Sequence, residues 1–93
     1  MTDRPLLTVI TPSLNQGRFL RDNLASIALQ GVTDVEQLIL DGGSTDETEA
    51  VIDEFPHAKL VSLPDSNQSE ALTEGFRRAR GRYICWLNTD DIL

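Results

Sequence analysis

The residues best suited to chemistry lie near the end of the 93-residue chain, where Asn88, Thr89, Asp90 and Asp91 follow one another. Their amide, hydroxyl and carboxylate oxygens are the hard ligands that Mg²⁺ and Mn²⁺ prefer. A divalent cation on Asp90 and Asp91 would neutralise a diphosphate that an acidic protein otherwise repels. The same residue types also turn the chain and cap helices, so the motif by itself leaves a structural role open.

Zinc is a poorer fit, because the chain holds a single histidine, His57, and a single cysteine, Cys85. We expect His57 on the surface near the end of a helix, and Cys85 as a buried thiol without a catalytic role. One cysteine cannot form an internal disulfide, which favours a reducing compartment. We therefore expect a cytoplasmic protein, with the inner membrane surface as an alternative for the full-length protein.

Charge and hydropathy narrow the range of partners. The 15 acidic and 8 basic residues give a formal net charge of −7, so nucleic acid and anionic membrane surfaces are poor partners. The apolar stretch at 6–10 is too short for a signal peptide or a membrane span. An anionic ligand that binds through a cation is compatible with this charge.

Apolar runs predict strands at residues 6–11, 36–40, 59–63 and 83–87. Pro12 should end the first strand, because proline cannot donate to a ladder. The last run consists of apolar residues in unbroken succession, which is typical of a strand buried on both faces.

Helices are predicted between these strands. The first shows the i, i+4, i+7 spacing of an amphipathic helix. The second should run over 45–54, since Ser44 and Glu47 have the S-x-x-E form of a capping box, and Asn67 or Ser69 can cap the third. Strands that alternate with helices imply parallel strands joined by right-handed crossovers. We therefore expect an α/β fold, namely half of a Rossmann-like sheet.

Polar residues follow the predicted strands at the same end. Asn15, Asp41 and Asp65 come after the first three strands, and Asn88 comes after the fourth. Because the carboxyl ends of parallel strands share one edge, these residues should converge on one crevice. Asp41 is either a turn residue or a carboxylate that accepts an N–H from a nucleotide base. The chain has neither G-x-G-x-x-G nor G-x-x-x-x-G-K-[ST], so a dinucleotide fold and a P-loop are not supported.

A basic cluster follows the third predicted helix, with Arg77, Arg78, Arg80 and Arg82 close together in the sequence. These arginines could bind phosphate. A cluster at the end of a helix is more often a solvated face that complements the helix dipole, and we favour that interpretation.

Several motifs occur in a characteristic order: T-P-S-L-N at 11–15, L-D-G-G-S-T-D at 40–46 and W-L-N-T-D-D at 86–91. Together they resemble the nucleotide-sugar half of a family 2 glycosyltransferase of the GT-A fold, over nearly the whole chain. The resemblance implies a sugar nucleotide at the sheet edge. Pro12 and Asn15 would line the base and ribose pocket, and Asp41 would accept the base N–H.

The resemblance also assigns roles near the end of the chain. Asp65 would lie beside the nucleotide, while Asn88 and Asp90 occupy the first and last places of the family's D-x-D motif. Asn88 replaces the usual first aspartate, which leaves Asp90 and Asp91 to bind Mg²⁺ or Mn²⁺. Gly42 stands where many members have a second acid.

The activity implied is inverting transfer of a sugar from a nucleotide-diphosphate sugar, with a UDP-sugar favoured, to the hydroxyl of an unknown acceptor (a polysaccharide, a lipid-linked glycan or a protein glycan). Family members place the acceptor pocket and the catalytic base beyond the D-x-D motif. We therefore expect residues 1–93 to be a single partial domain without a catalytic base. A non-catalytic nucleotide-binding remnant is an alternative. A metal-dependent nucleotidyltransferase is weaker, because the glycine- and arginine-rich loop expected after the first strand is missing.

Overall fold

The computed structural model describes residues 5–29, 34–64 and 66–89. Its strands are β1 (Leu7–Ser13), β2 (Val35–Asp41), β3 (Ala58–Ser62) and β4 (Tyr83–Trp86). They form one sheet in the order β3-β2-β1-β4, and each neighbouring pair is parallel. The predicted α/β fold with a parallel sheet is confirmed.

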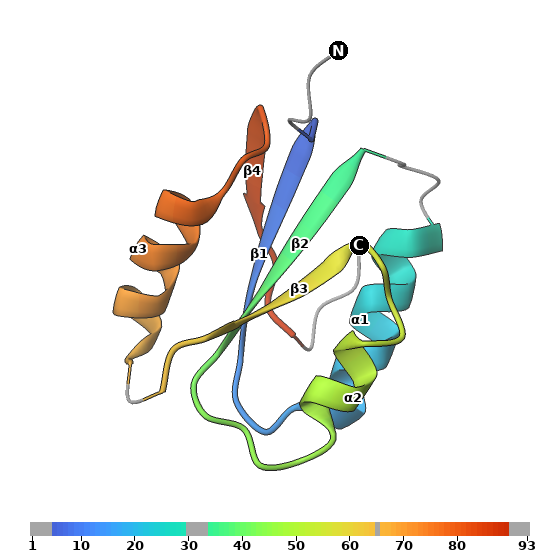
Figure 1. The fold of residues 1–93 in the computed structure, drawn as a ribbon, viewed down its shortest axis with the longest axis vertical. Coiled ribbons are helices and arrows are strands. Elements are labelled where there is room, and N and C mark those ends of the chain that lie inside the picture. Colours follow the sequence, from blue (N-terminus) through green and yellow to red (C-terminus); the bar gives the residue numbers. More distant parts are fainter. Residues whose placement is uncertain (1–4, 30–33, 65, 90–93) are drawn as a thin grey trace.

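Helices cover both faces of this sheet. Helices α1 (Gly17–Leu29) and α2 (Thr48–Ile52) lie on one face, and α3 (Gln68–Arg78) lies on the other (Figure 1). The core under α1 and α2 consists of buried aliphatic residues: Leu20, Leu24, Ile39, Val51 and Ile52. The core under α3 is built in the same way: Ile10, Leu38, Leu40, Val61 and Ala71. Among the described helices, none has the length and apolar character to cross a membrane.

Strand β1 continues through Pro12, where the sequence predicted its end. Ile10 is the last residue of β1 that pairs with β4. The Pro12 carbonyl accepts a hydrogen bond from the Thr89 hydroxyl at 2.7 Å. Since the nitrogen and the carbonyl of one strand residue face the same side, the missing N–H of Pro12 lies beyond the paired part of β4 and costs no ladder bond.

The prediction that the 83–87 strand is buried on both faces is wrong. β4 is an edge strand, and the side chains of Tyr83, Ile84 and Trp86 are 64%, 42% and 50% exposed. An apolar run alone cannot separate an interior strand from an edge strand. Cys85 is accordingly half-buried rather than buried.

His57 is also half-buried, and it precedes β3 instead of lying free on the surface. Its Nε2 lies 3.0 Å from Oε1 of Gln37 on β2. Burial lowers the pKa of the His57 imidazole.

The capping prediction failed for α2 and succeeded for α3. Helix α2 begins at Thr48, and its N-cap residue Glu47 makes no side-chain cap bond. The Thr48 N–H donates instead to the Asp46 carboxylate at 3.0 Å. Asn67 caps α3 in a full capping box, since its side chain accepts from the Glu70 N–H and the Glu70 carboxylate accepts from the Asn67 N–H.

A buried polar cluster holds the turn between α3 and β4. Glu36 on β2 is 5% exposed, and its Oε2 accepts from the Thr8 hydroxyl at 2.7 Å and from the Arg80 N–H at 2.8 Å. The Thr8 hydroxyl in turn accepts from the Gly81 N–H at 2.8 Å. Lys59 approaches Glu36 Oε1 at 3.5 Å. The turn therefore lies directly against the backbone of β1.

Replacing Gly81 should test this close approach. A Cβ at position 81 would lie 2.7 Å from the Leu7 carbonyl carbon and would clash with the Thr8 nitrogen. We expect Gly81→Ala to lower the free energy of unfolding by about 2 kcal/mol or more, measured by urea denaturation. Gly42→Ala is the matched control, because its nearest contact would be Leu14 Cδ1 at 3.7 Å. Equal stability of the two variants would contradict the packing described.

Glu36 should make stability depend on pH. Burial raises the pKa of this carboxyl, but the Thr8 hydroxyl, the Arg80 N–H and the Lys59 ammonium outweigh burial and hold it below its usual value. A lowered folded-state pKa stabilises the fold above the unfolded pKa of about 4.3, and this stabilisation is lost as the pH falls. In urea denaturation between about pH 5 and pH 3, Glu36→Gln should lose less stability than the wild type. Parallel pH profiles would refute the assignment.

Candidate functional site

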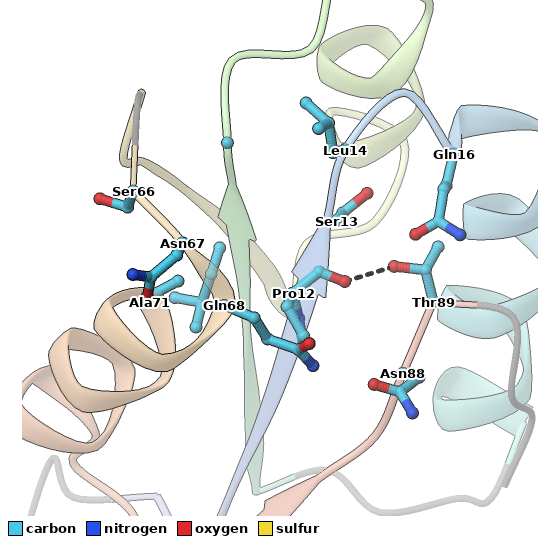
Figure 2. Close-up of a pocket in the computed structure, with 12 residues that line it drawn as sticks. Pro12, Ser13, Leu14, Gln16, Ser66, Asn67, Gln68, Ala71, Asn88 and Thr89 are labelled. Atoms are coloured by element: carbon cyan, nitrogen blue, oxygen red, sulfur yellow. Dashed lines mark hydrogen bonds between the residues drawn. The ribbon is translucent and has the colours of Figure 1, made fainter.

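A pocket of about 320 Å³ opens at the carboxyl edge of the sheet (Figure 2). It lies between the end of β1, the start of α3 and the segment that follows β4. Its walls come from strand ends, loops and the start of α3, which are distant in sequence: Pro12, Ser13, Leu14, Gln16, Leu40, Gly42, Ser66, Asn67, Gln68, Ala71, Asn88 and Thr89. Segments that follow different strands therefore meet at this edge of the sheet, as the parallel topology requires.

The predicted nucleotide-binding residues are distributed unevenly around this pocket. Pro12 and Asn88 line it, whereas Asn15, in the loop after β1, and Asp41, at the end of β2, do not belong to its walls. Asp65, which is also predicted to bind the nucleotide, lies outside the described residues, as do Asp90 and Asp91. Their assignments stay predictions.

Hydrogen bonds join the loop after β1 to the loop after β2. The Asn15 N–H donates to the Ser44 hydroxyl oxygen at 2.8 Å, and Asn15 Oδ1 accepts from the Thr45 N–H at 2.9 Å. The Gly17 N–H donates to the Asp46 carboxylate at 3.0 Å. Asn15 has a φ of 51°, in the left-handed region that asparagine tolerates. Ser44 is thus used for a contact between loops, which explains why it does not cap α2.

Asp41 is held in the same network. It is 8% exposed, and its Oδ1 accepts from the Ser44 N–H at 3.1 Å and from the Ser44 hydroxyl. An ionised carboxylate has about four acceptor positions, so these bonds orient Asp41 and leave acceptor capacity for another donor. The adjacent Gly42 forms part of the pocket wall.

The segment after β4 is fixed by contacts from several elements. The Thr89 hydroxyl donates to the Pro12 carbonyl, which Figure 2 shows as a dashed line. Trp86 Nε1 donates to Asn88 Oδ1 at 3.0 Å, and Asn23 Nδ2 of α1 donates to the Asn88 carbonyl at 3.0 Å. Thr89 is 2% exposed. The backbone is therefore held in place just before Asp90.

The donor set of this segment suits a hard divalent cation, because the Asn88 amide and the two following carboxylates all present oxygen. Within residues 5–29, 34–64 and 66–89, no group of three or more His, Cys, Asp or Glu side chains could hold a metal ion. The assignment of Asp90 and Asp91 as metal ligands stays a prediction.

Sequence reasoning missed Ser13 and Gln68. Ser13 is 5% exposed and lines the pocket, and its Oγ has no hydrogen-bond partner among the described residues. A buried hydroxyl without a partner is costly, so a ligand donor or acceptor would be favourable there. Gln68 opens α3 beside the capping box. The place of Ser13 in the T-P-S-L-N motif, next to Pro12, is a sequence signal that could have identified it.

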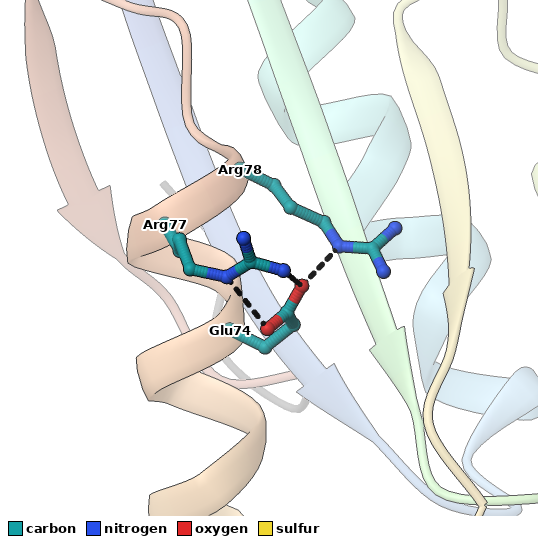
Figure 3. Close-up of polar contacts among 3 residues, drawn as sticks. All are labelled: Glu74, Arg77 and Arg78. Atoms are coloured by element: carbon teal, nitrogen blue, oxygen red, sulfur yellow. Dashed lines mark hydrogen bonds and ion pairs between the residues drawn. The ribbon is translucent and has the colours of Figure 1, made fainter.

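The arginines of α3 form hydrogen bonds with an acid on the same helix. Glu74 accepts from Arg77 Nε at 3.0 Å and from Arg78 Nε at 2.6 Å (Figure 3). Hydrogen bonds from Arg77 and then Arg78 lower the pKa of Glu74 to about 2. Both arginine side chains are more than half exposed. The interpretation of a solvated helix face is supported for this pair.

Comparison with known proteins gives a consistent result. The model of the family "Glycosyl transferase family 2" matches residues 8–93. A PGL/p-HBAD biosynthesis glycosyltransferase of Mycobacterium bovis (strain BCG / Pasteur 1173P2) is 36% identical over 94 aligned positions, which cover 96% of this chain and 37% of that protein. The chain thus spans little more than a third of this relative.

Solved structures share the fold. The mannosyltransferase PcManGT from Pyrobaculum calidifontis, in complex with GDP-Man and Mn²⁺, superposes with a TM-score of 0.83 at 25% identity, over 98% of this chain and 29% of that one. Glucosyl-3-phosphoglycerate synthase from Mycobacterium tuberculosis, in complex with Mn²⁺, UDP and glucosyl-3-phosphoglycerate, gives a TM-score of 0.76 at 26% identity, over 91% and 33% of the two chains.

The loop network can be tested at Asn15. Asn15→Ala removes the acceptor for the Thr45 N–H and places a less tolerant residue at a φ of 51°, so we expect a loss of about 1 kcal/mol in urea denaturation. Hydrogen exchange of the Thr45 amide should accelerate. Asn15→Gly relieves the backbone strain but not the lost acceptor, so it should show the same acceleration. Asn15→Asp keeps the acceptor and should preserve protection. Unchanged Thr45 exchange in both the alanine and the glycine variants would disprove the link.

Proposed function

The chain belongs to glycosyl transferase family 2, and we propose that it is the part of such an enzyme that binds a nucleotide-diphosphate sugar. The observation that carries the proposal is the pocket at the carboxyl edge, closed on one side by Asn88 and Thr89 and followed directly by Asp90 and Asp91. Open α/β sheets bind their ligands at this edge. A pocket of about 320 Å³ is at the lower end for ligand sites and suits the nucleoside part of a donor.

In this proposal different residues contact different parts of the nucleotide. Pro12 and the backbone at Gly42 would contact the base and ribose, with Asn15 supporting the same loop. Asp41, oriented by Ser44, would accept an N–H from the base, and Asp65 would lie beside the nucleotide. The Ser13 hydroxyl would find in the ligand the partner that it lacks. These roles use neutral contacts and two carboxylates, which suit a base and a sugar better than a phosphate.

The diphosphate needs a cation, because the chain carries a net charge of −7. The start of α3 is a poor phosphate site, since the Glu70 carboxylate already accepts from the Asn67 N–H there. Asp90 and Asp91, with Asn88 beside them in a D-x-D-like motif, would hold Mg²⁺ or Mn²⁺. When bound, the cation would stabilise the charge of the departing nucleoside diphosphate. Complexes of similar proteins with Mn²⁺ and UDP or GDP-Man support this choice.

The remaining parts of the reaction are assigned to the region that the longer relatives have beyond the matched third. That region would supply the acceptor pocket and the base that deprotonates the acceptor hydroxyl for inverting transfer. We propose a cytoplasmic enzyme that uses UDP-sugar, with the acceptor left to experiment. The 93-residue chain should bind nucleotide weakly and transfer nothing.

Calorimetric titration of UDP and GDP, with and without Mn²⁺ or Mg²⁺, tests the donor site. We expect nucleotide binding that depends on the cation, and a loss of at least about 10-fold in affinity for the Asp90→Ala, Asp91→Ala double variant. The control is Glu49→Ala with Asp53→Ala, which removes two acids at exposed positions of the α2 region. It should bind as the wild type does. Circular dichroism should show that each variant is folded.

Cation-independent binding, or equal losses in both double variants, would argue against the metal assignment. A folded wild-type chain that binds neither nucleotide would argue against the donor site itself.

A further inference from the structure

A hydrogen-bond network of two buried amide side chains crosses the core between β2 and the pocket. Gln37 and Asn23 are both 0% exposed, although both are polar. Gln37 Nε2 donates to Asn23 Oδ1 at 2.7 Å and to Thr11 Oγ1 at 2.9 Å. Asn23 Nδ2 donates to the Asn88 carbonyl at 3.0 Å, across 65 positions of sequence.

The hydrogen bonds of this amide network have a defined direction. Because the Gln37 nitrogen donates to Thr11 and Asn23, the Gln37 oxygen is the acceptor toward His57 Nε2, 3.0 Å away. Asn23 likewise accepts with its oxygen and donates with its nitrogen. A flip of either amide would oppose two like groups. The network therefore presents a donor, and not an acceptor, to the Asn88 carbonyl.

Stability alone does not explain Asn23. It occupies the buried stripe of α1 with Leu20, Leu24 and Ile27, where leucine would bury apolar area without the cost of an amide. A donor at this position has a specific target, because Asn88 lines the pocket and is separated from Asp90 by one residue. The hydrogen bond that fixes this segment offsets the free-energy cost of burying the Asn23 amide.

We propose that Asn23 is a positioning residue for the nucleotide-sugar site. It holds the Asn88 carbonyl, two positions before Asp90 in the sequence. The proposal rests on the proposed function of that segment as the cation and diphosphate site. Asn23 does not line the pocket, so it acts on the ligand through Asn88.

The chain contains its own reporter for this contact. Trp86 is the single tryptophan, and its Nε1 donates to Asn88 Oδ1 at 3.0 Å. The indole N–H resonance and the fluorescence of Trp86 therefore respond to the placement of Asn88. This readout needs neither a metal nor a nucleotide.

Two variants separate the effect of the Asn23 N–H donor from that of the rest of the Asn23 side chain. Asn23→Leu replaces the amide by an apolar group of similar size and should remain folded in its leucine-rich stripe. Asn23→Asp keeps an acceptor for Gln37 Nε2 and loses the donor to Asn88. We expect both to shift the Trp86 indole N–H resonance and to weaken Mn²⁺-dependent UDP binding about 10-fold, as loss of a group that orients metal ligands commonly does.

Ile27→Ala is the matched control. Ile27 lies four positions further along α1 and is 2% exposed, so its truncation lowers stability without touching the amide chain. It should leave the Trp86 resonance and the nucleotide affinity at wild-type values. If Ile27→Ala changes both as much as the Asn23 variants do, the effect is general destabilisation and the proposal is wrong.

The outcomes also separate this proposal from the donor-site proposal. A wild-type chain that binds no UDP refutes the donor site, whereas the Trp86 shift still decides whether Asn23 holds Asn88. A wild-type chain that binds UDP, with Asn23→Leu folded and both readouts unchanged, overturns the positioning role alone. Should Asn23→Asp unfold, Asn23→Leu decides the matter.

Discussion

The loops at the carboxyl edge depend on hydrogen bonds between residues that are far apart in sequence. Asn15 bonds to Ser44 and Thr45 in the loop after β2, and the Thr89 hydroxyl bonds to the carbonyl of Pro12. Each bond removes conformational freedom from a loop before any ligand arrives, which lowers the entropic cost of binding. The pocket is consequently a property of the folded sheet edge as a whole, and no single loop could form it.

Local patterns predicted the elements that depend on local interactions. The alternation of strands and helices yielded the parallel sheet, and Asn67 caps α3 because both partners of its capping box lie within one helical turn. Prediction failed where a distant partner intervened. Ser44 is used by Asn15 rather than by α2, and β4 is exposed because its apolar run lies at the sheet edge. Neither fact is contained in a short window of sequence.

The candidate site was predicted in the same partial way. Asn88 follows from the rule that ligands bind beyond the carboxyl ends of strands, Pro12 was assigned through the family resemblance, and both line the pocket. Asn23 and Gln37 were overlooked, although Asn23 interrupts an otherwise apolar helix stripe and could have been noticed for that reason. Their partners lie on other elements, so their role became visible only with the three-dimensional arrangement.

The adjacent polar residues Glu36 and Gln37 have a consequence for how the sheet assembles. They point to opposite faces of β2, and each finds its own set of partners, with Thr8 on one face and Asn23 on the other. A slip of β2 by one position would exchange the faces and leave a carboxylate and an amide buried against the wrong groups. Apolar neighbours such as Leu38 and Ile39 would tolerate that exchange far better. Two polar side chains thus encode the register of a strand whose hydrophobic residues alone would leave it ambiguous.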